Sequence, residues 1–230
     1  ISMPGMMDTI LNLGLNDETV EGLAKKSNNS RFAWDSYRRF VQLFGKVVFG
    51  VDDKKFDKVL ENAKKNQNVD LDSELSESSL RDIVSQYKKI CEEHTGRPFP
   101  SNPDEQLELS IKAVFNSWMG ERALVYREKN NITKDIADGT AVNVVAMAFG
   151  NMGNDSSTGV IFTRNPSDGT NKIFGEYLIN AQGEDVVAGI RTPKQVDEMK
   201  KEIPETYNQL LKTCSKLEKH YKEPQDIEFT

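Results

Sequence analysis

Apolar side chains in the first half of the chain recur every three to five residues, which is the spacing of one face of an α-helix. The segments 53–65 and 76–94 share this spacing, and Ser76 or Ser78 is suited to cap the second of them. The pattern predicts a helical first half. The clearest case is the segment 32–48, whose apolar face consists of Phe32, Tyr37, Phe40, Val41, Phe44 and Val48.

The segment 105–119 continues the helical pattern after a connection rich in Gly, Pro and Asn. A helix over these residues places several large apolar side chains on one side, which we expect to face the core. These residues are Leu107, Ile111, Val114, Phe115 and Trp118.

After Asp138 the pattern changes to short stretches rich in β-branched and aromatic residues, which predict strands. The segments 151–157 and 165–171 have the composition of hairpin turns. A last helix is expected over 192–221, with an interruption at Pro204. Helices followed by a sheet with a helix packed on it predict an α+β fold with a mostly antiparallel sheet. The expected strands lie in 140–150, 157–166, 171–181 and 225–230.

The composition is that of an ordinary soluble protein, with 37% hydrophobic and 29% charged residues. No apolar run approaches the roughly 20 residues of a membrane span, so we expect no membrane partner. The net charge of −6 argues against a nucleic-acid partner. Cys91 and Cys214 belong to no Cys-x-x-Cys pair, which favours free thiols in a reducing cytosol.

Asp226 and Glu228 form an Asp-x-Glu pair inside the expected strand 225–230. Residues two apart in a strand share a face, so both carboxylates point one way while Ile227 and Phe229 point into the core. Two neighbouring like charges are costly unless a cation lies between them, and carboxylate oxygens suit Mg²⁺. The alternative interpretation is a half-exposed edge strand with a polar face.

Three further carboxylates lie in the stretch GEYLINAQGEDVVAG. Glu176 shares a strand face with Leu178, and its alternative role is to pair with Lys or Arg on a neighbouring strand. Glu184 and Asp185 follow Gly183, which predicts a loop, and their alternative is a solvated turn.

The chain begins with ISMPGMMDTILNLGLND, in which Gly5 and Gly14 allow the backbone to approach a ligand closely. The alternative is a buried structural loop filled by methionine. No P-loop motif is present in the sequence. His94 and His220 lie in Lys/Glu-rich surroundings, and we interpret both as surface residues.

Taken in order, several segments resemble the pyruvate, phosphate dikinase family in its ATP-grasp-type nucleotide-binding region. The resemblance implies an ATP-grasp core that starts in residues 1–16, a helical insertion over 17–104 and a second core part over 105–230. Since the chain does not begin with Met, we expect it to be a piece of a longer polypeptide. The matching segments are ISMPGMMDTILNLGLND, AKKSNNSRFAWDSYRRF, VFNSWMGERALVYR, GTAVNVVAMAFGNMGNDSSTGVIFTRNPSDG and GEYLINAQGEDVVAGIRTP.

By the same resemblance, Mg²⁺ is held by Glu176, Asp226 and Glu228, and ATP is the ligand of the pocket. No catalytic residue is expected in the chain, since the family's phosphohistidine belongs to another domain. Phosphate and pyruvate are partners of the intact enzyme, which is expected to be a homodimer in the cytoplasm, a plastid or a glycosome. The residues implied in nucleotide binding are Met147, Thr163, Arg164, Glu184, Asp185, Asp226 and Glu228.

Two other functions stay open. A phosphoenolpyruvate synthase-type phosphotransferase has the same fold, although its sequence differs in the segment that corresponds to SMPGMMDTILN. A non-catalytic binding module would use the helical half as a partner surface, and a tight partner without any nucleotide effect would favour it.

Overall fold

The computed structural model describes residues 3, 5–188 and 191–230, and the side chains of residues 184, 187 and 188 lie outside this description. The chain divides into two compact units, Ile1–Met147 and Ala148–Thr230, and each unit is treated separately below. No helix in the described part of the chain is both long and apolar enough to cross a membrane.

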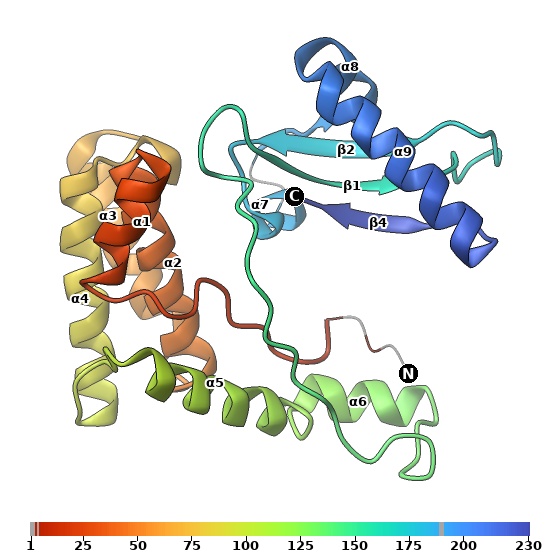
Figure 1. The fold of residues 1–230 in the computed structure, drawn as a ribbon. Coiled ribbons are helices and arrows are strands. Elements are labelled where there is room, and N and C mark those ends of the chain that lie inside the picture. Colours follow the sequence, from red (N-terminus) through yellow and green to blue (C-terminus); the bar gives the residue numbers. More distant parts are fainter. Residues whose placement is uncertain (1–2, 4, 189–190) are drawn as a thin grey trace. The chain divides into compact units, whose positions relative to one another are not determined.

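The first unit is helical, as its apolar spacing predicts (Figure 1). Polar side chains at the helix starts accept backbone N–H groups that would otherwise be unpaired. The prediction for Ser76 is confirmed, since its hydroxyl accepts the N–H of Ser79 at 3.3 Å. The helices are α1 (Thr19–Ser27), α2 (Ser30–Val47), α3 (Asp53–Gln67), α4 (Glu77–Thr95), α5 (Pro103–Ser117) and α6 (Glu121–Lys129), with a 3-10 turn η1 (Asp72–Glu74) between α3 and α4.

The core of this unit forms around α2, which packs against α1, α3 and α4. The predicted apolar face of 32–48 is confirmed, because its members are buried except for the half-buried Val48. Aromatic rings meet edge to face in this core, for example Phe44 with Phe99 at a centroid distance of 5.3 Å. Helical period alone therefore located the core of this unit.

The prediction for the core-facing side of α5 is wrong in part. Phe115 is 50% exposed, whereas the buried positions of the helix are the polar residues Gln106, Ser110 and Ser117. At Gln106 and Ser117 the reason is that α5 packs on the backbone of residues 8–15, whose N–H and C=O groups need polar partners, whereas the Ser110 hydroxyl has no hydrogen-bond partner among the described residues. A face that covers bare backbone is polar even though it is buried.

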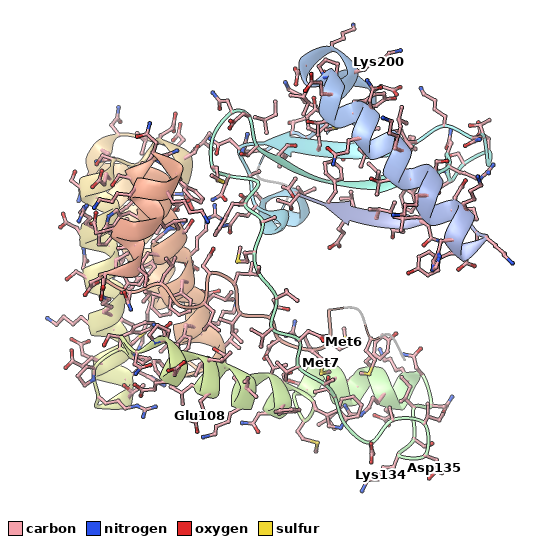
Figure 2. The ribbon with its side chains drawn as sticks, in the orientation of Figure 1. Met6, Met7, Glu108, Lys134, Asp135 and Lys200 are labelled. Atoms are coloured by element: carbon pink, nitrogen blue, oxygen red, sulfur yellow. The ribbon has the colours of Figure 1, made fainter. Side chains whose placement is uncertain are left out.

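Gln106 satisfies three backbone groups from inside the unit. Its carbonyl oxygen accepts the N–H of Gly14 at 3.0 Å, and its amide nitrogen donates to the carbonyls of Leu15 (3.1 Å) and Pro100 (2.9 Å). Further along, Ser117 Oγ accepts the N–H of Asp8 at 3.1 Å and lies 3.7 Å from the sulfur of Met7, which Figure 2 labels. The polar face of α5 thus holds the segment 8–15 in place.

A buried ionic cluster ties α2 to the turn η1. Arg38 donates to Asp35 at 2.7 Å and lies 3.4 Å from Asp72, and Arg39 reaches Asp35 at 3.3 Å. Burial by itself would raise the pKa of Asp35, but the charges of Arg38 and Arg39 outweigh it and lower the pKa to about 2. Asp35 is therefore charged in the folded protein.

The second unit is α+β, and every pairing in its sheet is antiparallel, as predicted. The strand order is β3-β2-β1-β4, which leaves β1 between β2 and β4 (Figure 1). The strands are β1 (Ser157–Phe162), β2 (Phe174–Ile179), β3 (Lys194–Gln195) and β4 (Asp226–Phe229). The other elements are α7 (Gly183–Ala188), η2 (Val196–Glu198), α8 (Met199–Glu202) and α9 (Pro204–Tyr221).

One face of this sheet forms the core together with α8 and α9. Ile161 and Tyr177 pack there with Met199, Leu210 and other apolar residues. The interruption predicted at Pro204 is confirmed, because α8 ends at Glu202 and α9 begins at Pro204. Covering this face leaves the opposite face of the sheet for other contacts.

Two local predictions in or next to this unit are wrong. The segment 140–150 forms no strand: Val144 and Val145 are 64% and 79% exposed, and the segment has no strand partner among the described residues. High β-propensity alone does not make a strand, since an unpaired extended segment leaves its backbone bonds unmade. The expected loop after Gly183 is instead the short helix α7.

The hairpin turn predicted at 165–171 is confirmed between β1 and β2.

Candidate functional site

Two carboxylates flank the same residue of the central strand. In the antiparallel register, Val160 of β1 is directly opposite Glu176 of β2 on one side and Glu228 of β4 on the other. Directly opposite residues of antiparallel strands place their side chains on one face. With strands about 4.8 Å apart, the Cα atoms of Glu176 and Glu228 are separated by roughly 10 Å.

The alternation predicted for β4 is confirmed. Asp226 and Glu228 are exposed, whereas Ile227 and Phe229 are partly buried against the core cluster on the other face. Within the described residues, neither carboxylate has a hydrogen-bond or ion-pair partner. Uncompensated acidic side chains on one sheet face attract cations.

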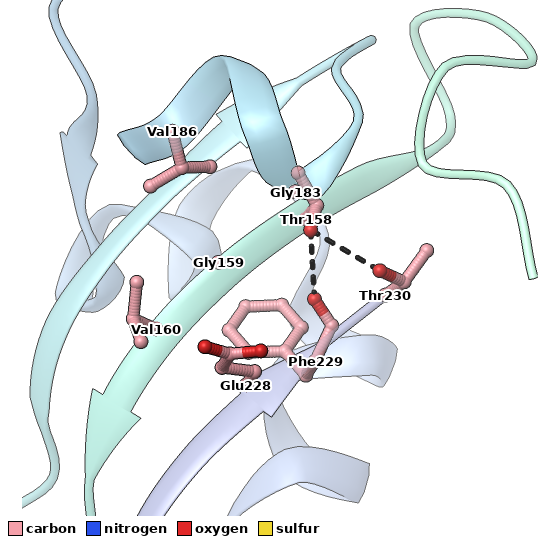
Figure 3. Close-up of a pocket in the computed structure, with 8 residues that line it drawn as sticks. All are labelled: Thr158, Gly159, Val160, Gly183, Val186, Glu228, Phe229 and Thr230. Atoms are coloured by element: carbon pink, nitrogen blue, oxygen red, sulfur yellow. Dashed lines mark hydrogen bonds between the residues drawn. The ribbon is translucent and has the colours of Figure 1, made fainter. Parts of the chain in front are cut away.

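A pocket of about 330 Å³ lies on this face, between β1, β4 and α7 (Figure 3). Its polar wall includes the hydroxyl of Thr158, which donates to the carbonyl of Phe229 at 3.0 Å and lies 3.1 Å from the hydroxyl of Thr230. Glu228 lines the pocket from β4, and Gly183 and Val186 line it from α7. The pocket therefore combines apolar surface, hydroxyl groups and one carboxylate.

A glycine on β1 sets how closely its neighbours approach beneath this face. A Cβ atom on Gly159 would lie 2.5 Å from the carbonyl oxygen of Glu176 and 2.7 Å from the ring of Phe229. Neither distance is tolerated by a real side chain, so only glycine permits this approach. The spacing of the two acidic strands around β1 depends on that position.

The partner of Glu176 is an amide and not a cation. Gln195 of β3 is directly opposite Glu176, and its Nε2 donates to Glu176 Oε1 at 3.0 Å. The alternative role of Glu176 as a partner for Lys or Arg has no support among the described contacts. Its negative charge is left available on the exposed face.

The three carboxylates predicted as metal ligands share a face but do not converge on one point. In the described part of the chain, no three His, Cys, Asp or Glu side chains surround a single metal position. Their chemistry nevertheless fits a hard cation: Mg²⁺ takes oxygen ligands, uses few carboxylates and retains water or ligand phosphates. The residues that would hold it are Glu176, Asp226 and Glu228.

The side chains of Thr163 and Arg164 donate to Glu218 of α9 and not to the carboxylates of the acidic face, while Thr163 Oγ1 also accepts the N–H of Gln225, the residue before β4, at 2.9 Å. Thr163 lies directly beyond the end of β1, and its hydroxyl donates to Glu218 of α9 at 3.0 Å. Arg164 forms a two-point contact with the same carboxylate, at 2.7 and 3.2 Å. The hydrogen bond from Arg164 lowers the pKa of Glu218, against the effect of burial. This clamp fastens the end of β1 to α9.

The remaining predicted residues are dispersed. The Asp185 carboxylate accepts the backbone N–H of Gln182 at 2.8 Å, which caps the start of α7. Glu184 lies in α7, and its side chain is outside the described residues. Met147 belongs to the first unit, where its sulfur accepts the N–H of Asn12 at 3.0 Å.

Sequence reasoning missed Thr158, Val160 and Gln195. The strand alternation in 157–162 carried a signal for the first two, because they share the parity that faces away from the core. Gln195 carried none, since β3 has only two residues and lies where the pattern predicts a helix.

A helical unit joined in sequence to an α+β unit with an acidic, pocketed sheet face defines a ligand-binding domain. The chain belongs to the family described as pyruvate phosphate dikinase, AMP/ATP-binding domain, whose model matches residues 1–205.

Curated relatives match over the full length of the chain. It is 58% identical to pyruvate, phosphate dikinase of Entamoeba histolytica, and the match covers 26% of that protein. It is 57% identical to the chloroplastic pyruvate, phosphate dikinase of Mesembryanthemum crystallinum and 56% identical to the chloroplastic pyruvate, phosphate dikinase 1 of Zea mays, covering 24% of each. The chain thus spans about a quarter of the length of these relatives.

Proposed function

We propose that the acidic face of the second unit binds Mg²⁺–ATP, and that the chain is the nucleotide-binding part of a pyruvate, phosphate dikinase. The observation that carries this proposal is the strand register, which sets Glu176 and Glu228 on either side of Val160 with Asp226 on the same face. Membership of a family described by its AMP/ATP-binding domain supports ATP as the ligand.

In the proposed reaction, ATP, phosphate and pyruvate are converted to AMP, diphosphate and phosphoenolpyruvate by way of a phosphohistidine. Bound Mg²⁺ would neutralise charge on the transferring phosphates. The chain's own carboxylates orient the cation-bearing triphosphate, and the hydroxyl oxygens of Thr158 and Thr230 lie at the pocket wall, where the Thr158 proton is donated to the carbonyl of Phe229.

The phosphoryl acceptor in this proposal is a histidine outside residues 1–230. The engagement of both histidines of the chain supports this assignment. His94 Nε2 lies 3.1 Å from the carbonyl oxygen of Phe49, and the ring of His220 packs edge to face on Tyr221 at 4.8 Å. No catalytic residue is therefore assigned within the chain.

The proposal extends to the fold, the oligomeric state and the location of the intact protein. The α+β unit with its antiparallel sheet is taken as part of an ATP-grasp core, in which residues 1–16 also belong to the core and 17–104 are a helical insertion. A homodimer, a cytoplasmic location and the binding of phosphate and pyruvate by the intact protein are proposed on the same basis. Met147, Thr163, Arg164, Glu184 and Asp185 stay proposed as nucleotide-binding residues by the family resemblance, and the described lining of the pocket on the acidic face includes none of them.

A phosphoenolpyruvate synthase-type enzyme is the second candidate. The relatives reported above are named dikinases, which favours the dikinase. Phosphate dependence of the ATP half-reaction separates the two enzymes: the dikinase requires inorganic phosphate, whereas the synthase does not. A non-catalytic binding module would show no effect of nucleotide on its partner.

The decisive experiment is calorimetric titration of the intact protein with ATP in the presence of Mg²⁺. We expect Glu228→Gln and Asp226→Asn each to weaken binding about tenfold or more, because a ligand charge is lost. Glu223→Gln, on the exposed turn before β4, is the matched control and should bind normally. Unchanged affinity in both strand variants would reject the assigned site.

A further inference from the structure

The acidic row on the sheet extends to a fourth strand. Gln195 of β3 lies directly opposite Glu176, so one lateral row runs through Glu228, Val160, Glu176 and Gln195. The amide Nε2 of Gln195 donates to Oε1 of Glu176 at 3.0 Å. One carboxylate oxygen of Glu176 is thereby held, and the other accepts no hydrogen bond from the described residues.

The residue type at position 195 determines whether the negative charge of Glu176 is neutralised. A Lys or Arg opposite Glu176 would fix the carboxylate but also compensate it, and it would compete with an incoming cation. A glutamine amide donates one hydrogen bond and adds no charge. It therefore restricts an exposed, freely rotating glutamate without lowering its attraction for a cation.

Gln195 is itself held by its surroundings. Its backbone N–H donates to Glu198 Oε1 at 3.2 Å, at the start of the turn η2. Next to it, Lys194 pairs with Glu202 of α8, and Glu202 also accepts the hydroxyl of Tyr177 at 2.7 Å. The two-residue strand is thus anchored to the core side of the unit, which gives the amide a fixed position from which to act.

We propose that Gln195 is a positioning residue for Glu176 in the Mg²⁺–ATP site, an inference that rests on the proposed function. Groups that hydrogen-bond a metal-binding carboxylate orient it, and their loss weakens metal binding without removing a ligand. An ordinary cross-strand pair would instead contribute only to the stability of the sheet. The two roles make different predictions for metal dependence.

The test measures ATP binding by the intact protein as a function of Mg²⁺ concentration. For Gln195→Met, which preserves length and removes the amide, we expect the Mg²⁺ concentration for half-maximal binding to rise about tenfold. Excess Mg²⁺ should restore binding, while ATP binding in EDTA and the melting temperature should stay unchanged. Gln209→Met, the same exchange at an exposed position of α9, is the matched control and should leave the Mg²⁺ dependence unaltered.

A second comparison uses Glu176→Gln alone and together with Gln195→Met. If Gln195 acts through Glu176, adding Gln195→Met to Glu176→Gln has no further effect. If Glu176→Gln weakens Mg²⁺-dependent binding while Gln195→Met does not, the inference about Gln195 fails and the proposed function stands. If Glu176→Gln, Asp226→Asn and Glu228→Gln all leave binding unchanged, the proposed site fails and the inference fails with it.

Discussion

Glu176 and Glu228 are opposite the same residue, Val160, from the two sides of the central strand. They are 52 residues apart in sequence (228 − 176), and only the strand order β2-β1-β4 brings them into one row. Each is exposed on the face that α9 does not cover. A charged side chain introduced at position 160 would therefore lie next to both glutamates.

A lysine in place of Val160 would stand between the two glutamates and imitate a bound cation. At low salt we expect the Val160→Lys variant to have a free energy of unfolding about 1 kcal/mol higher than that of Val160→Gln. The gain comes from two partly exposed cross-strand ion pairs, between the lysine and each glutamate. The difference should vanish near 1 M salt, where the charges are screened. Urea denaturation at two salt concentrations measures it, and equal stability of the two variants at low salt would show that the glutamates do not share this face.

Removing the amide of Gln106 should release the segment 8–15 from α5. Gln106→Leu leaves the N–H of Gly14 and the carbonyls of Leu15 and Pro100 without their partner. We expect a loss of about 3 kcal/mol in the free energy of unfolding, since buried backbone groups without partners are costly. Gln86→Leu, at an exposed position of α4, is the matched control. A similar small effect for both variants would contradict the structural role.

The stability of the helical unit should depend on pH through Asp35. Its pKa of about 2 lies below the ordinary value of 3.8, so between these values the unfolded chain binds more protons than the folded one. The contribution of Asp35 is therefore complete above pH 4 and is lost as the pH falls towards 2. It amounts to about 2 kcal/mol.

Comparison with Asp35→Asn isolates this contribution from those of other carboxylates. The variant leaves the buried Arg38 with Asp72, at 3.4 Å, as its remaining charged partner, so we expect it to be less stable by about 3 kcal/mol at neutral pH. The difference between the two proteins should shrink as the pH falls from 4 to 2. A difference that stays constant over this range would mean that Asp35 does not titrate there.

The two cysteines should be inaccessible to thiol reagents in the folded protein. Cys91 and Cys214 are free and buried, and burial raises the pKa of Cys91 to about 12 and also raises that of Cys214. Since the thiolate is the reactive form, we expect negligible labelling at pH 8 and two equivalents in denaturant. Rapid labelling of either cysteine without denaturant would contradict the burial of its thiol.

Regular periodicity made some features predictable. The apolar face of 32–48 followed from helical spacing, and the outward position of Asp226 and Glu228 followed from strand alternation. Both are properties of a single element, so no knowledge of its neighbours was required. The cap at Ser76 was local in the same sense, because it depends on residues three apart.

Other features depend on which elements meet. Phe115 has the right spacing for the core but is half exposed, because α5 turns Gln106 and Ser117 towards the backbone of residues 8–15. The segment 140–150 has strand composition but no strand partner among the described residues. In both cases the structure of the segment depends on the element that packs against it and not on its own apolar pattern. An element that is distant in sequence cannot be inferred from the local pattern.

The sequence by itself determined the α+β class, the helical first half, and the acidic residues that share one face of β4. The tertiary structure decided that Glu176 joins that face, which only the family resemblance had implied, that Gln195 holds it, and that Thr163 and Arg164 turn to Glu218. The physical reason is that alternation fixes the side on which a side chain lies, whereas strand order and register fix what it meets there.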